Sequence, residues 1–178
     1  PTTPVRPVGV GGEVIIKPAD GIDDPRASDA GRALMHFVHQ RTGGQRLMRR
    51  SDFSPADLKD YLPYIMIVEV VYDADGNVCD GMVRLMGSAL VGFYGEYTGR
   101  SVLEHPSQSG ERFLRVATIA VETGSIIIGS AEQATPDRPF FKLITCSVPL
   151  AGKSGRIEQM LAHFQLFDKE GRPFPATL

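Results

Sequence analysis

The sequence predicts an α+β fold in which five antiparallel strands form one sheet with helices on one face. Two β-rich runs, residues 65–73 and 78–86, are separated by a turn that contains Asp-Gly, which supplies the positive φ of a tight hairpin. Three further β-rich runs, at residues 125–134, 140–150 and 156–167, follow a helical stretch. Consecutive hairpins with one helical insert build an antiparallel sheet that helices cover.

The first 26 residues of the chain differ from the rest in composition. Prolines and glycines interrupt residues 1–26, which leaves room for at most a short strand at residues 13–17. On this basis the chain divides into a flexible tail at residues 1–26, a helix with its connector at 27–50, the main domain at 51–170 and a C-terminal tail at 171–178.

The first helix is expected to begin at Ser28 or Asp29, either of which can cap free backbone amides. Its apolar stripe is narrow and consists of Leu34, Phe37 and Val38. A stripe of this width suits one contact surface, which is either the sheet or a partner subunit. We expect these three residues to form the contact of a homodimer.

The helical insert contains two starting signals. Ser54, followed by Pro55 and by Asp57 three residues after the cap, begins a short helix. A longer helix is predicted over residues 108–122, with Phe113, Val116, Ala117 and Ala120 as its buried stripe.

The segment between the second strand and the long helix resembles the middle of a PAS domain. The run Val83–Pro106 reads as a strand end, a Gly-Ser turn, a short helix, a Thr-Gly-Arg turn and an aliphatic segment that ends in His-Pro. More narrowly, the chain resembles a bacterial family of single-domain PAS-like proteins, through residues 50–55, 84–89, 94–100 and 148–150. The order and spacing of these motifs carry the resemblance.

The resemblance implies a sensory or regulatory module and no reaction, so no catalytic residue is expected. Such a module would bind a small molecule or a protein partner and act through protein–protein association. Two alternatives remain open. One is a small α+β enzyme or ligand carrier with a cone-shaped cavity, and the other is a structural interaction domain with a filled core.

A ligand is expected in a cleft between the long helix and the inner face of the sheet, bound by Arg84, Tyr94, Phe113, Ala117 and His163. Arg84 interrupts an apolar strand, so it either anchors an anion in the cleft, pairs with Glu69 of the adjacent strand, or faces solvent. His163 also interrupts an apolar strand. It either lines the cleft or is a core histidine with its hydrogen bonds satisfied.

Composition argues against several classes of partner. The net charge of −2 gives no footprint for nucleic acid, and no apolar run approaches the roughly 18 residues of a membrane span. Cys79 and Cys146 lie in predicted strands, and their spacing is not that of metal ligands. We therefore expect both to be reduced core thiols of a cytoplasmic protein.

No metal or other cofactor is expected. His36 and His39 share a helix face but lack further ligands. The long helix has no histidine, which leaves His105 as the one candidate haem ligand. The Asn-Cys-Arg-Phe motif of light-sensing PAS domains is replaced here by Tyr-Gly-Glu-Tyr.

Overall fold

The computed structural model describes residues 14–133, 141–168 and 170–174. The turn predicted between the strands at 125–134 and 140–150 lies outside these residues. The elements follow in the order β1 (Ile15–Pro18), α1 (Asp29–Thr42), β2 (Met48–Arg49), η1 (Arg50–Asp52), η2 (Pro55–Leu58), η3 (Leu62–Tyr64), β3 (Ile65–Tyr72), β4 (Val78–Met86), α2 (Ser88–Tyr94), η4 (Val102–Glu104), α3 (Ser109–Thr123), β5 (Ile127–Gln133), β6 (Phe141–Ala151) and β7 (Ile157–Phe167), where η marks a short 3-10 helix.

The five expected strands form the centre of one sheet, in the order β5-β6-β7-β3-β4, and all neighbours are antiparallel. Two short strands extend it. β1 pairs with β5 at the edge, and β2 pairs in parallel with β6. The predicted α+β class is confirmed. The order of the elements along the chain is the one expected for a PAS-like fold.

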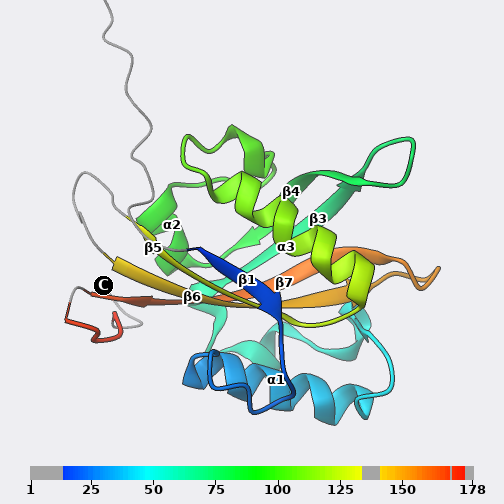
Figure 1. Cartoon of the computed structure of the whole chain (residues 1–178), viewed down its shortest axis with the longest axis horizontal. Coiled ribbons are helices and arrows are strands. Elements are labelled where there is room, and N and C mark those ends of the chain that lie inside the picture. Colours follow the sequence, from blue (N-terminus) through cyan, green and yellow to red (C-terminus); the bar gives the residue numbers. More distant parts are fainter. Residues whose placement is uncertain (1–13, 134–140, 169, 175–178) are drawn as a thin grey trace, which may run out of the picture.

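Helices cover both faces of the sheet (Figure 1). α3 crosses one face, and α2 packs on the same face through Leu90, which is buried with Leu143 and Leu166 of the sheet. α1 lies across the other face. The helices between β4 and β5 lie on one face, as predicted, and the separate N-terminal helix α1 covers the other face. None of the helices in the described part of the chain has both the length and the apolar character that a membrane span requires.

The ends of α1 form as the sequence predicts. The Ser28 hydroxyl accepts a hydrogen bond from the Gly31 amide at 3.0 Å, and Gly43 ends the helix with a φ of 66°. Gly31 also lets the helix approach the sheet, because a Cβ at this position would lie 3.2 Å from the Cβ of Cys146.

The proposed dimer stripe on α1 is used within the protein itself. Leu34 and Val38 are buried in one cluster with Ile65 and Leu161 of the sheet, and Phe37 is partly buried against the same cluster. The expectation that this stripe forms a dimer contact is therefore wrong, since the sheet already covers it. An apolar helical stripe looks the same in the sequence whether a sheet or a partner subunit covers it. The stripe alone therefore does not distinguish these two covering surfaces.

The described parts of the two predicted tails contact the sheet. The short strand expected at residues 13–17 is β1, which extends the sheet. Near the C-terminus, Phe174 returns to the sheet, where its amide donates to the Leu166 carbonyl at 2.9 Å and its ring meets Phe93.

Candidate functional site

A cavity of about 120 Å³ lies between α3 and the sheet. Its walls come from most elements on this side of the molecule, and its floor comes from the strands. The described lining residues are Val14, Ile16, Met66, Val68, Val83, Met86, Tyr94, Tyr97, Val102, His105, Ser109, Arg112, Phe113, Val116, Gly129, Ser130, Ala131, Leu143, Thr145, Ser147, Met160, Ala162 and Phe164. Most of these side chains are apolar, as in ordinary small-molecule pockets.

The floor of the cavity is hollow because its central side chains are small. Gly129, Thr145, Ser147 and Ala162 occupy adjacent positions on β5, β6 and β7 and line the cavity. A Cβ added at Gly129 would lie 2.5 Å from Thr145 Oγ1, so a larger side chain is excluded there without a shift.

Phe113 and Tyr94 both form part of the cavity wall. The Phe113 ring lies directly on the backbone of Gly81, where an added Cβ would come within 2.4 Å of its Cε1 atom. Tyr94, at the end of α2, meets the edges of His105 and Phe164 with ring centroids 5.7 and 6.3 Å apart. Both residues line the cavity as predicted, and their part in ligand binding stays a prediction.

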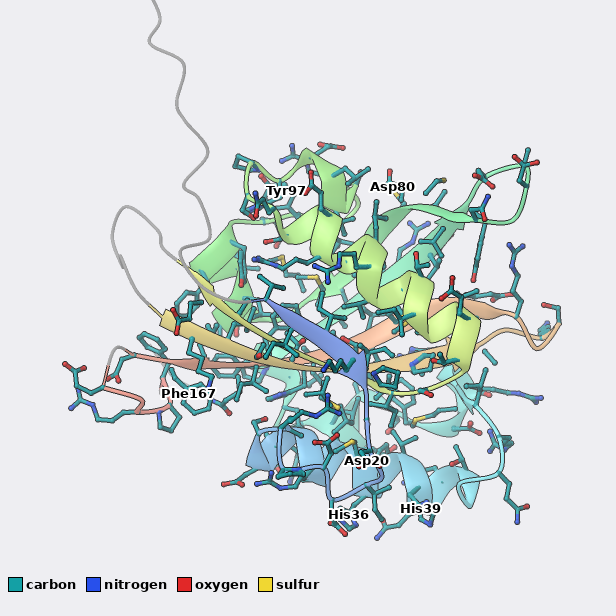
Figure 2. The ribbon with its side chains drawn as sticks, in the orientation of Figure 1. Asp20, His36, His39, Asp80, Tyr97 and Phe167 are labelled. Carbon is teal, nitrogen blue, oxygen red and sulfur yellow. The ribbon has the colours of Figure 1, made fainter. Side chains whose placement is uncertain are left out.

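The polar end of the cavity lies at the beginning of α3, below the loop that carries Tyr97 (Figure 2). His105 sits there with both ring nitrogens engaged. Its Nε2 lies 3.0 Å from the Tyr94 carbonyl and must donate, while its Nδ1 accepts from the Ser107 amide at 3.1 Å. Burial lowers the pKa of His105, which favours this neutral ring. A ring bonded in this way offers no lone pair to a haem iron.

A chain of hydrogen bonds continues from His105 to Arg112. Ser107 Oγ lies 2.7 Å from His105 Nδ1 and 2.6 Å from Ser109 Oγ. Arg112 Nη2 donates to Ser109 Oγ at 3.2 Å. Burial lowers the pKa of Arg112, although a guanidinium stays charged at neutral pH. The chain places a half-buried positive charge in the wall of an apolar cavity.

Arg84 is outside the cavity and pairs with Glu69, with 2.7 Å between Nε and Oε2. The expected role as an anion anchor in the cleft is therefore wrong, and the alternative pairing is confirmed. Strict alternation fails here because the register shifts: Val68 faces Val83, whereas Ile67 faces Leu85. This bulge inserts Arg84 as an extra residue and returns Met86 to the cavity side.

Ala117 and His163 are also outside the cavity lining. Ala117 is fully buried beside the cavity, in a cluster with Val116 and Ala120. His163 lies on the α1 face, opposite Cys146 in the strand register and edge-on to the Tyr61 ring at 5.9 Å. Their assignment to the cleft is therefore wrong. The sequence shows that a residue belongs to a buried helix stripe or to a strand. It does not show where the packing between these elements leaves a gap.

His163 is a core histidine, but it is not fully satisfied. It is 3% exposed, and its Nδ1 has no hydrogen-bond partner among the described residues. Burial lowers the pKa of His163 to about 4, so the ring is neutral at physiological pH. This histidine is a feature of the packed face rather than of the ligand site.

The remaining candidates are unconnected with the cavity. His36 and His39 lie on α1, on the far side of the sheet (Figure 2), and His36 Nε2 is 2.7 Å from Asp23 Oδ1. The described residues contain no group of three potential metal ligands. Both cysteines are free. Cys146 is buried as predicted, whereas Cys79 is exposed and so is not a core thiol.

The sequence argument missed Arg112, Ser109 and Tyr97. A signal for the first two was present, because Ser109, Arg112, Phe113 and Val116 fall at i, i+3, i+4 and i+7 and so share one helix face. The predicted stripe began only at Phe113, since it was chosen on apolar character. The contribution of Tyr97 depends on how its loop folds over α3, which no local pattern shows.

Comparison with known proteins adds little beyond the fold. No family model and no curated protein matches the chain. Among solved structures, an RNA-binding Light-Oxygen-Voltage receptor is similar, with 15% sequence identity and a TM-score of 0.45 over 85% of this chain. The chain spans 38% of that receptor's length. A likeness of this size says nothing of ligand or partner, so the PAS-like α+β fold rests on the order of the elements along the chain.

Proposed function

We propose that the protein is a sensory or regulatory PAS-like module, of the kind found in bacterial single-domain PAS-like proteins, and that a small molecule fills its cavity. The observation that supports this best is the cavity itself. Residues of three hydrophobic clusters line it, and Phe113, Met66 and Met86 link these clusters around the gap. A folded protein loses packing energy at such a gap, so its persistence favours a binding role.

The size of the cavity limits the ligand. A dry cavity of roughly 150 Å³ accepts benzene, so a volume of about 120 Å³ suits a molecule of that order, with more room if the helix moves. Macrocyclic or dinucleotide cofactors are far larger. The proposal therefore concerns a small metabolite-sized ligand with a largely apolar body.

The output of the module is proposed to be protein–protein association in the cytoplasm. Filling the cavity would favour one arrangement of α3 and the surrounding segments, and a partner that prefers this arrangement would then bind more tightly. A homodimer stays a prediction. Since the sheet covers Leu34 and Val38, a dimer would have to use another surface.

The alternative, a small enzyme or carrier, depends on chemistry in the cavity. A reaction would be favoured by a cavity carboxylate within hydrogen-bond reach of His163. However, His163 lies on the other face of the sheet. Among the described lining residues there is no Asp or Glu. A carrier and a sensor share the same cavity and differ in whether a filled cavity changes a partner's affinity.

The test is native mass spectrometry of the protein purified from its own host, beside the variant Ala162→Leu. The leucine would occupy the centre of the cavity floor. We expect an extra mass on the wild type that is absent from the variant. Val121→Leu, on an exposed position of α3, serves as the control and should keep the extra mass. An unoccupied wild type, or equal occupancy in Ala162→Leu, would contradict the proposal.

A further inference from the structure

Two hydroxyl groups stand in the largely apolar floor of the cavity. Thr145 and Ser147 are two residues apart on β6, so both point to the α3 side of the sheet, and both line the cavity. We propose that the ligand is a small neutral phenol, that is, one aromatic ring with one hydroxyl group, and that this hydroxyl bonds to Thr145 and Ser147. This inference rests on the proposed function, since it names the ligand class of the same cavity.

The two floor hydroxyls have no side-chain hydrogen bond in the described part of the chain. Neither Thr145 Oγ1 nor Ser147 Oγ bonds to another described residue. Ser147 is only 4% exposed, and a buried hydroxyl normally has a partner. Its oxygen is nevertheless not one of the fully enclosed, unpaired polar atoms, of which the described residues contain only His163 Nδ1, so it borders open space. A ligand hydroxyl in the cavity would supply the missing bonds, by donating to one oxygen and accepting from the other.

The polar groups at the beginning of α3 are already engaged within the protein. His105 uses both ring nitrogens, toward the Tyr94 carbonyl and toward Ser107. Arg112 donates to Ser109 Oγ and has further interactions within the protein. The polar group of a ligand is therefore left to the floor. A charged ligand would give up its water there for neutral hydroxyls, which restore too little of its hydration, so a neutral group is favoured.

The walls of the cavity favour an aromatic ring. Tyr94 and Phe164 lie edge to face with their ring centroids 6.3 Å apart, and Phe113 of α3 lines the same space. A ligand ring can make the same kind of contact with these side chains, which gains more than burial alone. Met66 and Met86 also line the cavity, and thioethers pack favourably against aromatic rings. The volume of about 120 Å³ is of the order that holds one benzene ring.

The experiment measures the affinity of three probes by NMR titration at neutral pH. The probes are phenol, toluene, in which a methyl group replaces the hydroxyl, and cyclohexanol, which carries the hydroxyl on an aliphatic ring. Phenol is neutral under these conditions, as a tyrosine side chain is. For the wild type we expect all three to bind, and phenol to bind at least about threefold more tightly than cyclohexanol because its ring suits the aromatic walls.

Two variants remove one floor hydroxyl each. Ser147→Ala and Thr145→Val should each weaken phenol by about fivefold to fiftyfold while changing toluene by less than about threefold. Thr145→Ser keeps a hydroxyl and should retain most of the phenol affinity. Ser51→Ala removes an exposed hydroxyl of η1, outside the cavity lining, and as the control it should change neither probe.

A crystal structure of the unmutated protein with phenol gives a second readout. We expect the phenol oxygen to lie within about 3.2 Å of Thr145 Oγ1 or Ser147 Oγ. This measurement needs no variant, so it decides the matter even if Ser147→Ala or Thr145→Val fails to fold.

The outcomes separate this inference from the proposed function. The phenol is wrong while the cavity stands if cyclohexanol binds as tightly as phenol, if the two variants weaken phenol no more than toluene, or if the crystal places the phenol oxygen away from both hydroxyls. If none of the three probes binds to the wild type, or if all bind equally well to Ala162→Leu, the cavity itself is not the receptor.

Discussion

On the α1 side of the sheet the buried residues form one continuous cluster, whereas on the α3 side they form three clusters around a cavity. The same strands supply both sides. β7 places Leu161 toward α1 and Ala162 toward α3, and β6 places Cys146 and Val148 toward α1 and Thr145 and Ser147 toward α3. Successive residues of these strands point to alternate sides of the sheet. The two sides differ because the residues that point toward α1 are larger or better packed and those that point toward α3 are small.

This difference indicates a division of roles between the two sides. The α1 side is not closed everywhere, because a hollow is lined by Met35 and Val38 of α1 and by Val148 of β6. The fully buried part around Leu34 gains dispersion energy and resists changes in volume, so it should carry much of the stability. The α3 side gives up part of this gain and keeps a space for a ligand. The following predictions are designed to break this contrast or to make it sharper.

The largest effect is expected from a cavity made on the packed side. Leu34 is fully buried in the α1 cluster, so Leu34→Ala should lower the free energy of unfolding by roughly 2–5 kcal/mol. Leu103→Ala, which truncates a leucine that is 46% exposed, is the matched control and should change it by less than about 0.5 kcal/mol. Urea unfolding measures both. A loss below about 1 kcal/mol for Leu34→Ala would mean that the α1 side is not the packed one.

The second prediction concerns pH and His163. Burial lowers its pKa to about 4 in the folded protein, compared with an ordinary value of about 6.5 in the unfolded chain. Between these two values the unfolded chain binds a proton that the folded protein does not, so stability falls as the pH falls from about 6.5 to 4, by about 3 kcal/mol in all. The nearby Cys146 offers no compensating charge, because burial raises the pKa of its thiol to about 12.

The measurement is the free energy of unfolding against pH for the wild type and for His163→Leu. The difference between the two curves isolates His163 from the carboxylates, which also titrate in this range. We expect the variant to lack most of the decline between pH 6.5 and 4. Parallel curves would show that His163 finds a partner or becomes exposed when it is protonated.

The smallest effect is expected at the bulge in β4. Arg84 and Glu69 form an ion pair whose side chains are 49% and 43% exposed, and exposed pairs contribute little. Arg84→Ala should lower stability by less than about 1 kcal/mol and keep the extra mass that native mass spectrometry finds on the wild type, because Arg84 is outside the cavity. Loss of that mass in Arg84→Ala would return Arg84 to the ligand site.

Most of the fold was predictable from the sequence because its signals are local. The caps at Ser28 and Gly43 and the Asp-Gly hairpin between β3 and β4 fix the elements within a few residues of where they lie. The side of the sheet that α1 covers was not predictable. It depends on contacts between residues more than a hundred positions apart, such as Leu34 and Leu161, which a single helix stripe does not reveal.

The site was predictable only in part. Tyr94 and Phe113 were found because they follow from the position of the short and long helices. Arg84 was placed wrongly because a one-residue bulge reverses the strand alternation, and such a bulge leaves no clear mark in the sequence. The hollow itself is a property of packing. It arises from how Gly129, Thr145 and Ala162 meet across three strands, and no segment of the chain contains that information.

The contrast between the two sides is tested most directly by one matched pair, Ala27→Leu and Ala162→Leu, compared by urea unfolding. Ala27 is buried in the α1 cluster, so the added carbons have no space and should cost about 1–3 kcal/mol. Ala162 borders the cavity, so the same carbons should enter it and change stability by less than about 0.5 kcal/mol or raise it. An equal loss in both variants would show that the α3 side is as filled as the α1 side and would contradict the account.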